Sequence, residues 1–219
     1  MEPKFKGVLF DLDGTLINTY DLIYASMRHT MDHFLDWRPT DEELMAGVGT
    51  PLEAQMIHFA GGDEAKGALM TDFYREHNHS VHDELIADFP GVMGMLQALA
   101  DAGVRMAVVT SKRHALAMRG CACFGIERYL EFLIGPDDCP LHKPDPAPVA
   151  LGCQRLGLDP AECLYVGDSP FDIQAGNGAG CATFAALWGM FPAEQLLACE
   201  PTFTGECAAD LQALVLGAK

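Results

Sequence analysis

Three short apolar segments, each followed directly by a small or acidic residue, constrain the fold of this 219-residue chain most strongly. They are Val8–Phe10 before Asp11, Met106–Val109 before Thr110, and Leu164–Val166 before Gly167 and Asp168. Continuous apolar runs of this length are typical of strands buried in parallel sheets. Because the carboxyl ends of parallel strands meet at one edge of the sheet, we expect the residues that follow these strands to form one site.

Helical patterns separate the strand-like segments. The apolar sets Val92, Leu96, Leu99 and Val149, Cys153, Leu156 each lie on one helical face before a glycine, at Gly103 and Gly157. A glycine in that position commonly ends a helix. Alternating strands and helices predict an α/β fold with a three-layer, Rossmann-like parallel sheet. Residues 181–185 are predicted to form a further strand, and residues 192–197 and 210–216 two further helices.

Residues 19–86 carry helix signals but no comparable strand-like segment. Thr40 and Glu43 have capping-box spacing, Pro51 suits a first helical turn, and two glycines at 61–62 precede a helix start at Asp63. We therefore predict an inserted α-helical cap domain, residues 19–86, on a catalytic core of residues 1–18 and 87–219.

The charge balance excludes several classes of protein. The chain has 31 Asp and Glu residues against 14 Lys and Arg, a net charge of −17, which disfavours nucleic acid and anionic membranes as partners. No segment approaches the ~20 apolar residues of a membrane span, and the charged first residues do not resemble a secretory signal. Eight cysteines are too few for a disulfide scaffold in a chain of this length. We expect a cytoplasmic protein, with no indication of whether it is a monomer or a homodimer.

Four acidic residues are expected to crowd the carboxyl edge of the sheet. Asp11 and Asp13 follow the first strand, and Asp168 and Asp172 follow the third. Burying several unpaired charges is costly, so such a cluster is more consistent with a cation site than with a structural role. Because all the ligands are oxygen atoms, Mg²⁺ is favoured over Zn²⁺.

Four ordered motifs resemble those of the haloacid-dehalogenase superfamily. They are Asp11-Leu12-Asp13-Gly14-Thr15, Val109-Thr110-Ser111-Lys112, His142-Lys143-Pro144-Asp145-Pro146 and Val166-Gly167-Asp168-Ser169-Pro170-Phe171-Asp172. Downstream segments, including Leu187-Trp188-Gly189, are similar to the phosphoglycolate-phosphatase and pyrophosphatase-like branch, which carries a helical cap after the first motif. The resemblance covers the chain from the first strand to about Gly189.

The resemblance implies a role for each matching residue. Asp11 is expected to be the nucleophile that forms an aspartyl-phosphate, and Asp13 the general acid and base. Thr110 and Lys143 are expected to bind the phosphoryl group and to neutralise its charge. The implied Mg²⁺ ligands are Asp11, Asp13 (through its backbone carbonyl), Asp168 and Asp172, the last either directly or by orienting Lys143; Gly14 and Ser111 are implied to contact substrate. For Lys112 and Arg113, a contact with substrate is the second interpretation, and the charged first turn of an exposed helix ranks above it.

The expected activity is Mg²⁺-dependent hydrolysis of a small phosphate ester. Within the resembled branch, 2-phosphoglycolate ranks first as substrate and inorganic pyrophosphate second. A sugar phosphomutase ranks lower, because the related mutases carry a histidine where this chain has Ile23. A catalytically silent binding protein is also a weaker reading, because Asp11, Asp13 and Lys143 are all present.

Overall fold

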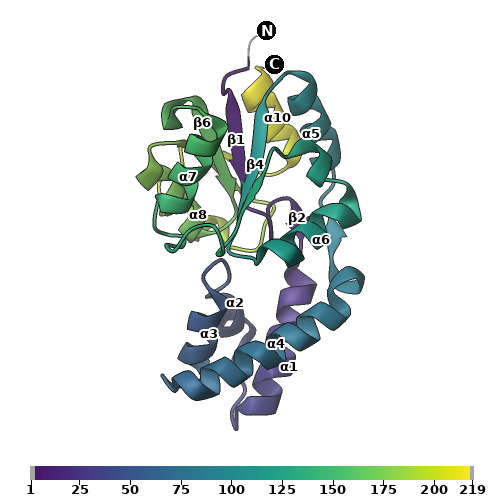
Figure 1. The fold of residues 1–219 in the computed structure, drawn as a ribbon, viewed down its shortest axis with the longest axis vertical. Helices are drawn as coiled ribbons and strands as arrows, with labels where there is room; N and C mark the ends of the chain where they lie inside the picture. Colours follow the sequence, from purple (N-terminus) through teal and green to yellow (C-terminus); the bar gives the residue numbers. More distant parts are fainter. Residues whose placement is uncertain (1–2, 218–219) are drawn as a thin grey trace.

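The computed structural model describes residues 3–217, and its main sheet contains six parallel strands. Their spatial order is β5-β4-β1-β6-β7-β8 (Figure 1). The strands are β1 (Gly7–Phe10), β4 (Arg105–Val109), β5 (Leu133–Ile134), β6 (Cys163–Gly167), β7 (Ala182–Ala186) and β8 (Phe203–Gly205). Strand β1 pairs with β4 on one side and β6 on the other, so the three strands predicted first are neighbours at the centre of the sheet.

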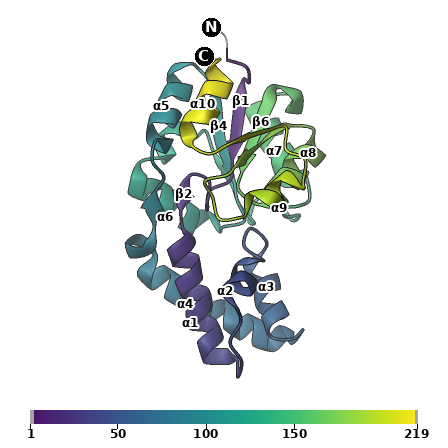
Figure 2. The same cartoon turned by 180° about the vertical axis from the view of Figure 1, so that it is seen from behind.

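Helices cover both faces of this sheet, which confirms the predicted three-layer α/β architecture (Figures 1 and 2). One face is covered by α5 (Val92–Asp101), α6 (His114–Phe124) and α10 (Ala208–Leu216), and the other by α7 (Ala147–Leu156) and α8 (Pro170–Ala179). Within β1, Val8 and Phe10 pack on the α5 side and Leu9 packs on the α7 side. Burial on both faces explains why these strands are continuous apolar runs.

Four helices beyond the carboxyl edge of the sheet form the helical insertion. They are α1 (Tyr20–Phe34), α2 (Asp41–Met45), α3 (Leu52–Phe59) and α4 (Glu64–Leu85) (Figure 1). They enclose a separate buried cluster made of Met27, Met31, Leu44, Met56, Met70 and Tyr74. The chain enters and leaves the insertion through an antiparallel ribbon of β2 (Ile17–Asn18) and β3 (Ala87–Asp88). This ribbon places the insertion over the ends of the central strands.

Local helix signals in the insertion correspond to observed helix ends. Thr40 forms a capping box with Glu43 at the start of α2, and the Asp63 side chain accepts a hydrogen bond from Lys66 N at the start of α4. Pro51 directly precedes α3. Near the C-terminus, β7, α10 and the short helix α9 (Ala193–Leu197) occur where a strand and two helices are predicted. Strands β5 and β8 were not predicted, because two or three residues give no periodic signal.

Membrane-spanning helices are absent from residues 3–217. Helix α4 has 22 residues and is long enough to span a bilayer, but it carries charged residues from Glu64 to Glu84. Within the insertion, α4 packs against both α1 and α3.

Candidate active site

Four loops that follow or precede core elements bring the predicted site residues to the sheet edge that faces the insertion. Asp11 follows β1, Thr110 follows β4, Asp168 follows β6, and Lys143 lies in the loop before α7. All four side chains are buried, with exposures between 2% and 7%. The convergence of parallel strand ends therefore brings these four residues together at one edge, where the sequence analysis expects them to meet.

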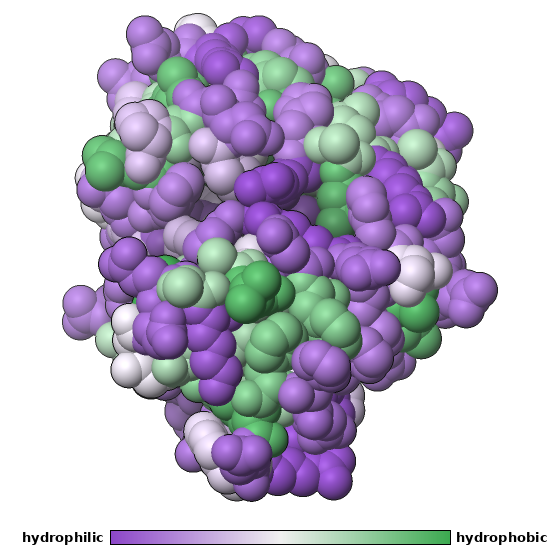
Figure 3. Space-filling model, turned by 60° about the horizontal axis from the view of Figure 1, so that its bottom comes forward, coloured by the Kyte–Doolittle hydropathy of each residue, from purple (hydrophilic) through white to green (hydrophobic). Residues whose placement is uncertain are grey.

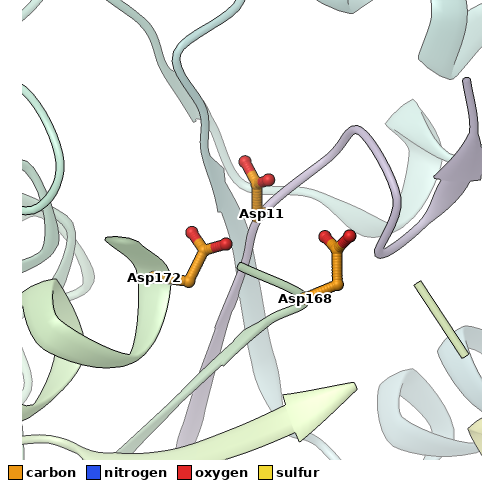
Figure 4. Close-up of side chains that lie close together, drawn as sticks. All are labelled: Asp11, Asp168 and Asp172. Carbon is orange, nitrogen blue, oxygen red and sulfur yellow. The ribbon is translucent and has the colours of Figure 1, made fainter. Parts of the chain in front are cut away.

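Three carboxylates converge at the centre of the site. Oxygen atoms of Asp11, Asp168 and Asp172 lie within 4.8 Å of one another, and all three residues are buried (Figure 4). Asp172 reaches the group from the first turn of α8, whereas the other two lie in loops after strands. Within residues 3–217, no other group of three or more histidine, cysteine or acidic residues has this spacing.

One buried ammonium group lies between two of these acids. Lys143 Nζ is 2.8 Å from Asp11 Oδ1 and 2.6 Å from Asp172 Oδ1. Burial alone lowers the pKa of Lys143, but the charges of the two carboxylates outweigh it and raise that pKa well above its usual value. Lys143 is therefore a permanent positive charge at the floor of the site.

The single lysine leaves the acids only partly compensated. Burial raises the pKa of Asp11 to about 7 although Lys143 lowers it, and the charge of Asp172 adds to the increase. Burial also raises the pKa of Asp168 well above its usual value, and the charges of Asp172 and Asp11 contribute. Asp11 Oδ1 is buried, and among the described residues its polar partner is the Lys143 ammonium group. A donor set made only of oxygen atoms, with excess negative charge, fits a hard divalent cation.

Several groups that the sequence analysis did not single out hold these acids in place. Asp168 accepts hydrogen bonds from Thr15 Oγ1 and from Met190 N, both at 2.8 Å. Asp172 accepts hydrogen bonds from Ser169 Oγ at 2.5 Å and from Tyr165 Oη at 3.2 Å. The Ser169-to-Asp172 spacing is a capping-box signal that could have been recognised, and the structure contains that box at the start of α8. Tyr165 and Met190 carry no such signal.

Asp13 lies apart from the three clustered carboxylates. Its Oδ1 is 2.8 Å from Lys112 Nζ, and the side chains are 18% and 9% exposed, respectively. The interpretation of Lys112 as part of an exposed helix is wrong, because α6 begins only at His114 and the Lys112 side chain turns inward to the Asp13 carboxylate. Asp13 is thus held by a cation and remains free to interact with a molecule bound above the cluster.

Gly14 and Ser111, both predicted to contact substrate, occupy different positions. Gly14 has a positive φ of 83°, and a Cβ there would lie 2.2 Å from Asp168 Oδ2, so this glycine permits close packing against the acid. Ser111 lines the cavity, and its Oγ donates a hydrogen bond of 2.7 Å to Gly49 O in the insertion. Ser111 therefore connects the core loop after β4 to the insertion.

A cavity of about 830 Å³ lies between the core loops and the insertion, and it includes Asp11, Asp13, Thr110 and Asp168 in its lining. The space-filling view shows a hydrophilic hollow beside an apolar area (Figure 3). From the insertion, residues 48–52 and Arg75 line the cavity, whereas Arg28 is not part of the lining and instead pairs with Asp41. The insertion therefore supplies one wall of the site.

Comparison with known families agrees with this geometry. The profile of the family described as haloacid dehalogenase-like hydrolase matches residues 8–186, which is most of the chain. The chain belongs to this family. The match spans the strands and loops that carry all the clustered acids of the hydrolase.

Individual relatives resemble the hydrolase over nearly its whole length. Pyrophosphatase PpaX from Bacillus velezensis is 37% identical over 96% of both chains. Pyrophosphatase PpaX from Bacillus pumilus is 36% identical over 98% of both chains. A solved structure described as a predicted phosphoglycolate phosphatase from Haemophilus somnus is 27% identical, with a TM-score of 0.81 over 95% of this chain and 96% of its own.

Proposed function

We propose that this hydrolase cleaves inorganic pyrophosphate into two orthophosphate ions. The observation that carries the proposal is the buried group of three carboxylates around Lys143, at the floor of a cavity closed by the insertion. The relatives named pyrophosphatase PpaX support pyrophosphate as the substrate. The order of substrates from the sequence analysis is therefore reversed, and 2-phosphoglycolate becomes the second candidate.

In the proposed first step, a carboxylate oxygen of Asp11 attacks one phosphorus atom. The bond from that phosphorus to the bridging oxygen breaks, and Asp13 gives a proton to the departing orthophosphate. Lys143, 2.8 Å from Asp11, offsets the negative charge that builds up on the phosphoryl oxygens. Thr110, which lines the cavity at the end of β4, donates its hydroxyl to one of those oxygens.

In the proposed second step, water attacks the phosphorus of the aspartyl-phosphate. Asp13 accepts a proton from that water, the Asp11–phosphorus bond breaks, and the second orthophosphate leaves. Asp11, Asp168 and Asp172 are the side chains that would hold Mg²⁺, which supplies charge neutralisation and orients the phosphoryl oxygens. The ion pair with Lys112 holds the Asp13 carboxylate at the wall of the cavity, from which it would exchange protons with the leaving group and with water.

The substrate is tested by comparing catalytic efficiencies on a panel of phosphate compounds. With Mg²⁺ present, we expect kcat/KM for pyrophosphate to exceed that for 2-phosphoglycolate and for hexose phosphates by at least about tenfold, a difference of ~1.4 kcal/mol in transition-state stabilisation. Phosphate release is measured for each compound under identical conditions. A higher kcat/KM for 2-phosphoglycolate would replace the proposed substrate by the second candidate.

Mg²⁺ affinity is expected to depend on pH. A bound cation requires ionised carboxylates, whereas burial gives Asp11 a pKa of about 7. At pH 6, one unit below that pKa, about nine-tenths of the Asp11 side chains hold a proton that Mg²⁺ must displace. We therefore expect the Kd for Mg²⁺ to be at least about tenfold weaker at pH 6 than at pH 8, as measured by calorimetry.

The same pKa gives a prediction for stability without added metal. Between the ordinary Asp value of 3.8 and about 7, the folded state binds more protons at Asp11 than the unfolded state does. The free energy of unfolding should therefore fall as pH rises through this range, and Mg²⁺ should restore it most strongly above pH 7.

For the prediction on Mg²⁺ affinity, equal affinities at pH 6 and pH 8, without proton release on binding, would show that these carboxylates do not hold the ion.

A further inference from the structure

Among residues 3–217, three strongly basic side chains line the cavity, and one of them pairs with a residue that the proposed mechanism uses. They are Arg75, Lys112 and Arg113. Lys112 is paired with Asp13, close to the clustered acids. The two arginines contact neither Asp13 nor the cluster, and the mechanism described above does not use them. Their role is therefore a separate question.

Arg75 and Arg113 reach the same carboxylate from opposite walls of the cavity. Arg75 belongs to α4 in the insertion, and its guanidinium is hydrogen-bonded to Glu53 Oε1, which lies on α3. Arg113 precedes α6 in the core, and its Nη2 is 3.5 Å from the same Glu53 oxygen. All three side chains line the cavity. The two guanidinium groups thus share the Glu53 carboxylate across the gap between the insertion and the core.

Another anion can displace the Glu53 carboxylate from these two arginines at low cost. The side chains of Arg75, Arg113 and Glu53 are 31%, 60% and 51% exposed, so water screens their pairing and no buried charge is created when it opens. A guanidinium group binds phosphate or carboxylate through two parallel hydrogen bonds. Arg75 Nη1 also lies 3.8 Å from Asp72 Oδ1, an exposed carboxylate that does not line the cavity. Within the lining, Glu53 is therefore the acid that the two arginines share.

We propose that Arg75 and Arg113 bind the second anionic group of the substrate, and that Glu53 competes with it for them. In pyrophosphate this group is the phosphate that leaves when Asp11 attacks, so the identity of the anion rests on the proposed function. The two arginines come from different parts of the fold, and binding between them also draws the insertion toward the core. They then select substrates that carry negative charge beyond the scissile phosphoryl group.

The experiment compares pyrophosphate with 4-nitrophenyl phosphate, whose leaving group lacks a second phosphate or carboxylate. Arg75→Gln and Arg113→Gln are each expected to raise KM for pyrophosphate about tenfold or more relative to KM for 4-nitrophenyl phosphate. Glu53→Gln is expected to shift the same ratio in the opposite direction, because it removes the competing carboxylate. Arg119→Gln and Arg155→Gln are matched controls. These arginines pair with Asp83 and Asp138, do not line the cavity, and should keep the wild-type ratio.

A second pair of substrates separates this proposal from the pyrophosphatase activity itself. 2-Phosphoglycolate carries a carboxylate near its phosphate, and ethyl phosphate does not. If the wild-type protein fails to hydrolyse pyrophosphate, the proposed function fails, and the ratio of KM values for these two esters still tests the arginines. The subsite is ruled out if Arg75→Gln and Arg113→Gln leave both substrate ratios at the wild-type value in proteins that melt at the wild-type temperature.

Discussion

Replacing Asp11 with asparagine is expected to lower kcat for pyrophosphate by at least about 10⁴-fold, the range seen when a covalent nucleophile is removed. Asparagine keeps the shape of the side chain but cannot form the acyl-phosphate bond. It also removes one of three crowded carboxylates, so we expect no loss of thermal stability at pH 8. Initial rates of phosphate release, measured with saturating Mg²⁺, provide the comparison.

The control for this variant is an exposed acid outside the site. Asp101, at the end of α5, accepts a hydrogen bond only from Gln97 among the described side chains and does not line the cavity. Asp101→Asn should retain the wild-type kcat. If Asp11→Asn instead keeps more than about a tenth of the wild-type rate, then Asp11 contributes only a metal ligand or a charge and the nucleophile must lie elsewhere.

Lys143→Met is expected to reduce both stability and rate. Removing this ammonium leaves Asp11 and Asp172 buried without their shared cation, and breaking a buried ion pair in this way typically costs about 3–5 kcal/mol. For a chain of this length, that corresponds to a decrease in Tm of about 6–20 °C. The decrease should be largest above pH 7, because protonation of Asp11, whose pKa burial raises to about 7, relieves the repulsion at lower pH. We also expect kcat to fall by about 10²–10³-fold.

Lys112→Met provides the matched comparison for the effect on stability. Lys112 also pairs with one aspartate, but the Asp13 side chain is 18% exposed, and no second acid in the described part of the chain pairs with the lysine. Thermal melts at pH 8 without added metal should therefore show a smaller decrease than for Lys143→Met. If the two variants melt at the same temperature, the charge of Lys143 does not dominate the balance within the acid cluster.

The sequence was sufficient to predict the central part of the fold and three members of the acid cluster, but Asp13, predicted as a fourth, pairs with Lys112 instead. Continuous apolar runs ending at Asp11, Thr110 and Asp168 specify buried parallel strands, and parallel strands bring their ends to one edge. Asp172 could be placed there because it lies in the first helical turn after one of these ends. The positions of these residues follow from local sequence patterns and from a general rule of sheet topology. Both can be applied to a single sequence.

The remaining contacts depend on how distant segments pack. Lys112 looks like a surface residue in sequence, and only the position of the Asp13 loop beside it turns it inward. Arg75 and Arg113 are 38 positions apart, and they meet at Glu53 because the insertion folds back over the core. Periodic and capping signals describe single helices and strands, so they do not predict a contact between the insertion and the core. For the same reason, the substrate could be ranked but not selected from sequence alone.

The central claim is that Asp11 becomes phosphorylated during pyrophosphate hydrolysis. The most direct measurement is a rapid acid quench of the wild-type protein mixed with ³²P-labelled pyrophosphate and Mg²⁺, followed by mapping of the label. The account predicts a covalent phosphoryl group on the peptide that contains Asp11, formed before steady state and absent from Asp11→Asn. Hydrolysis without labelled protein at any quench time, together with an active Asp11→Asn variant, would contradict it.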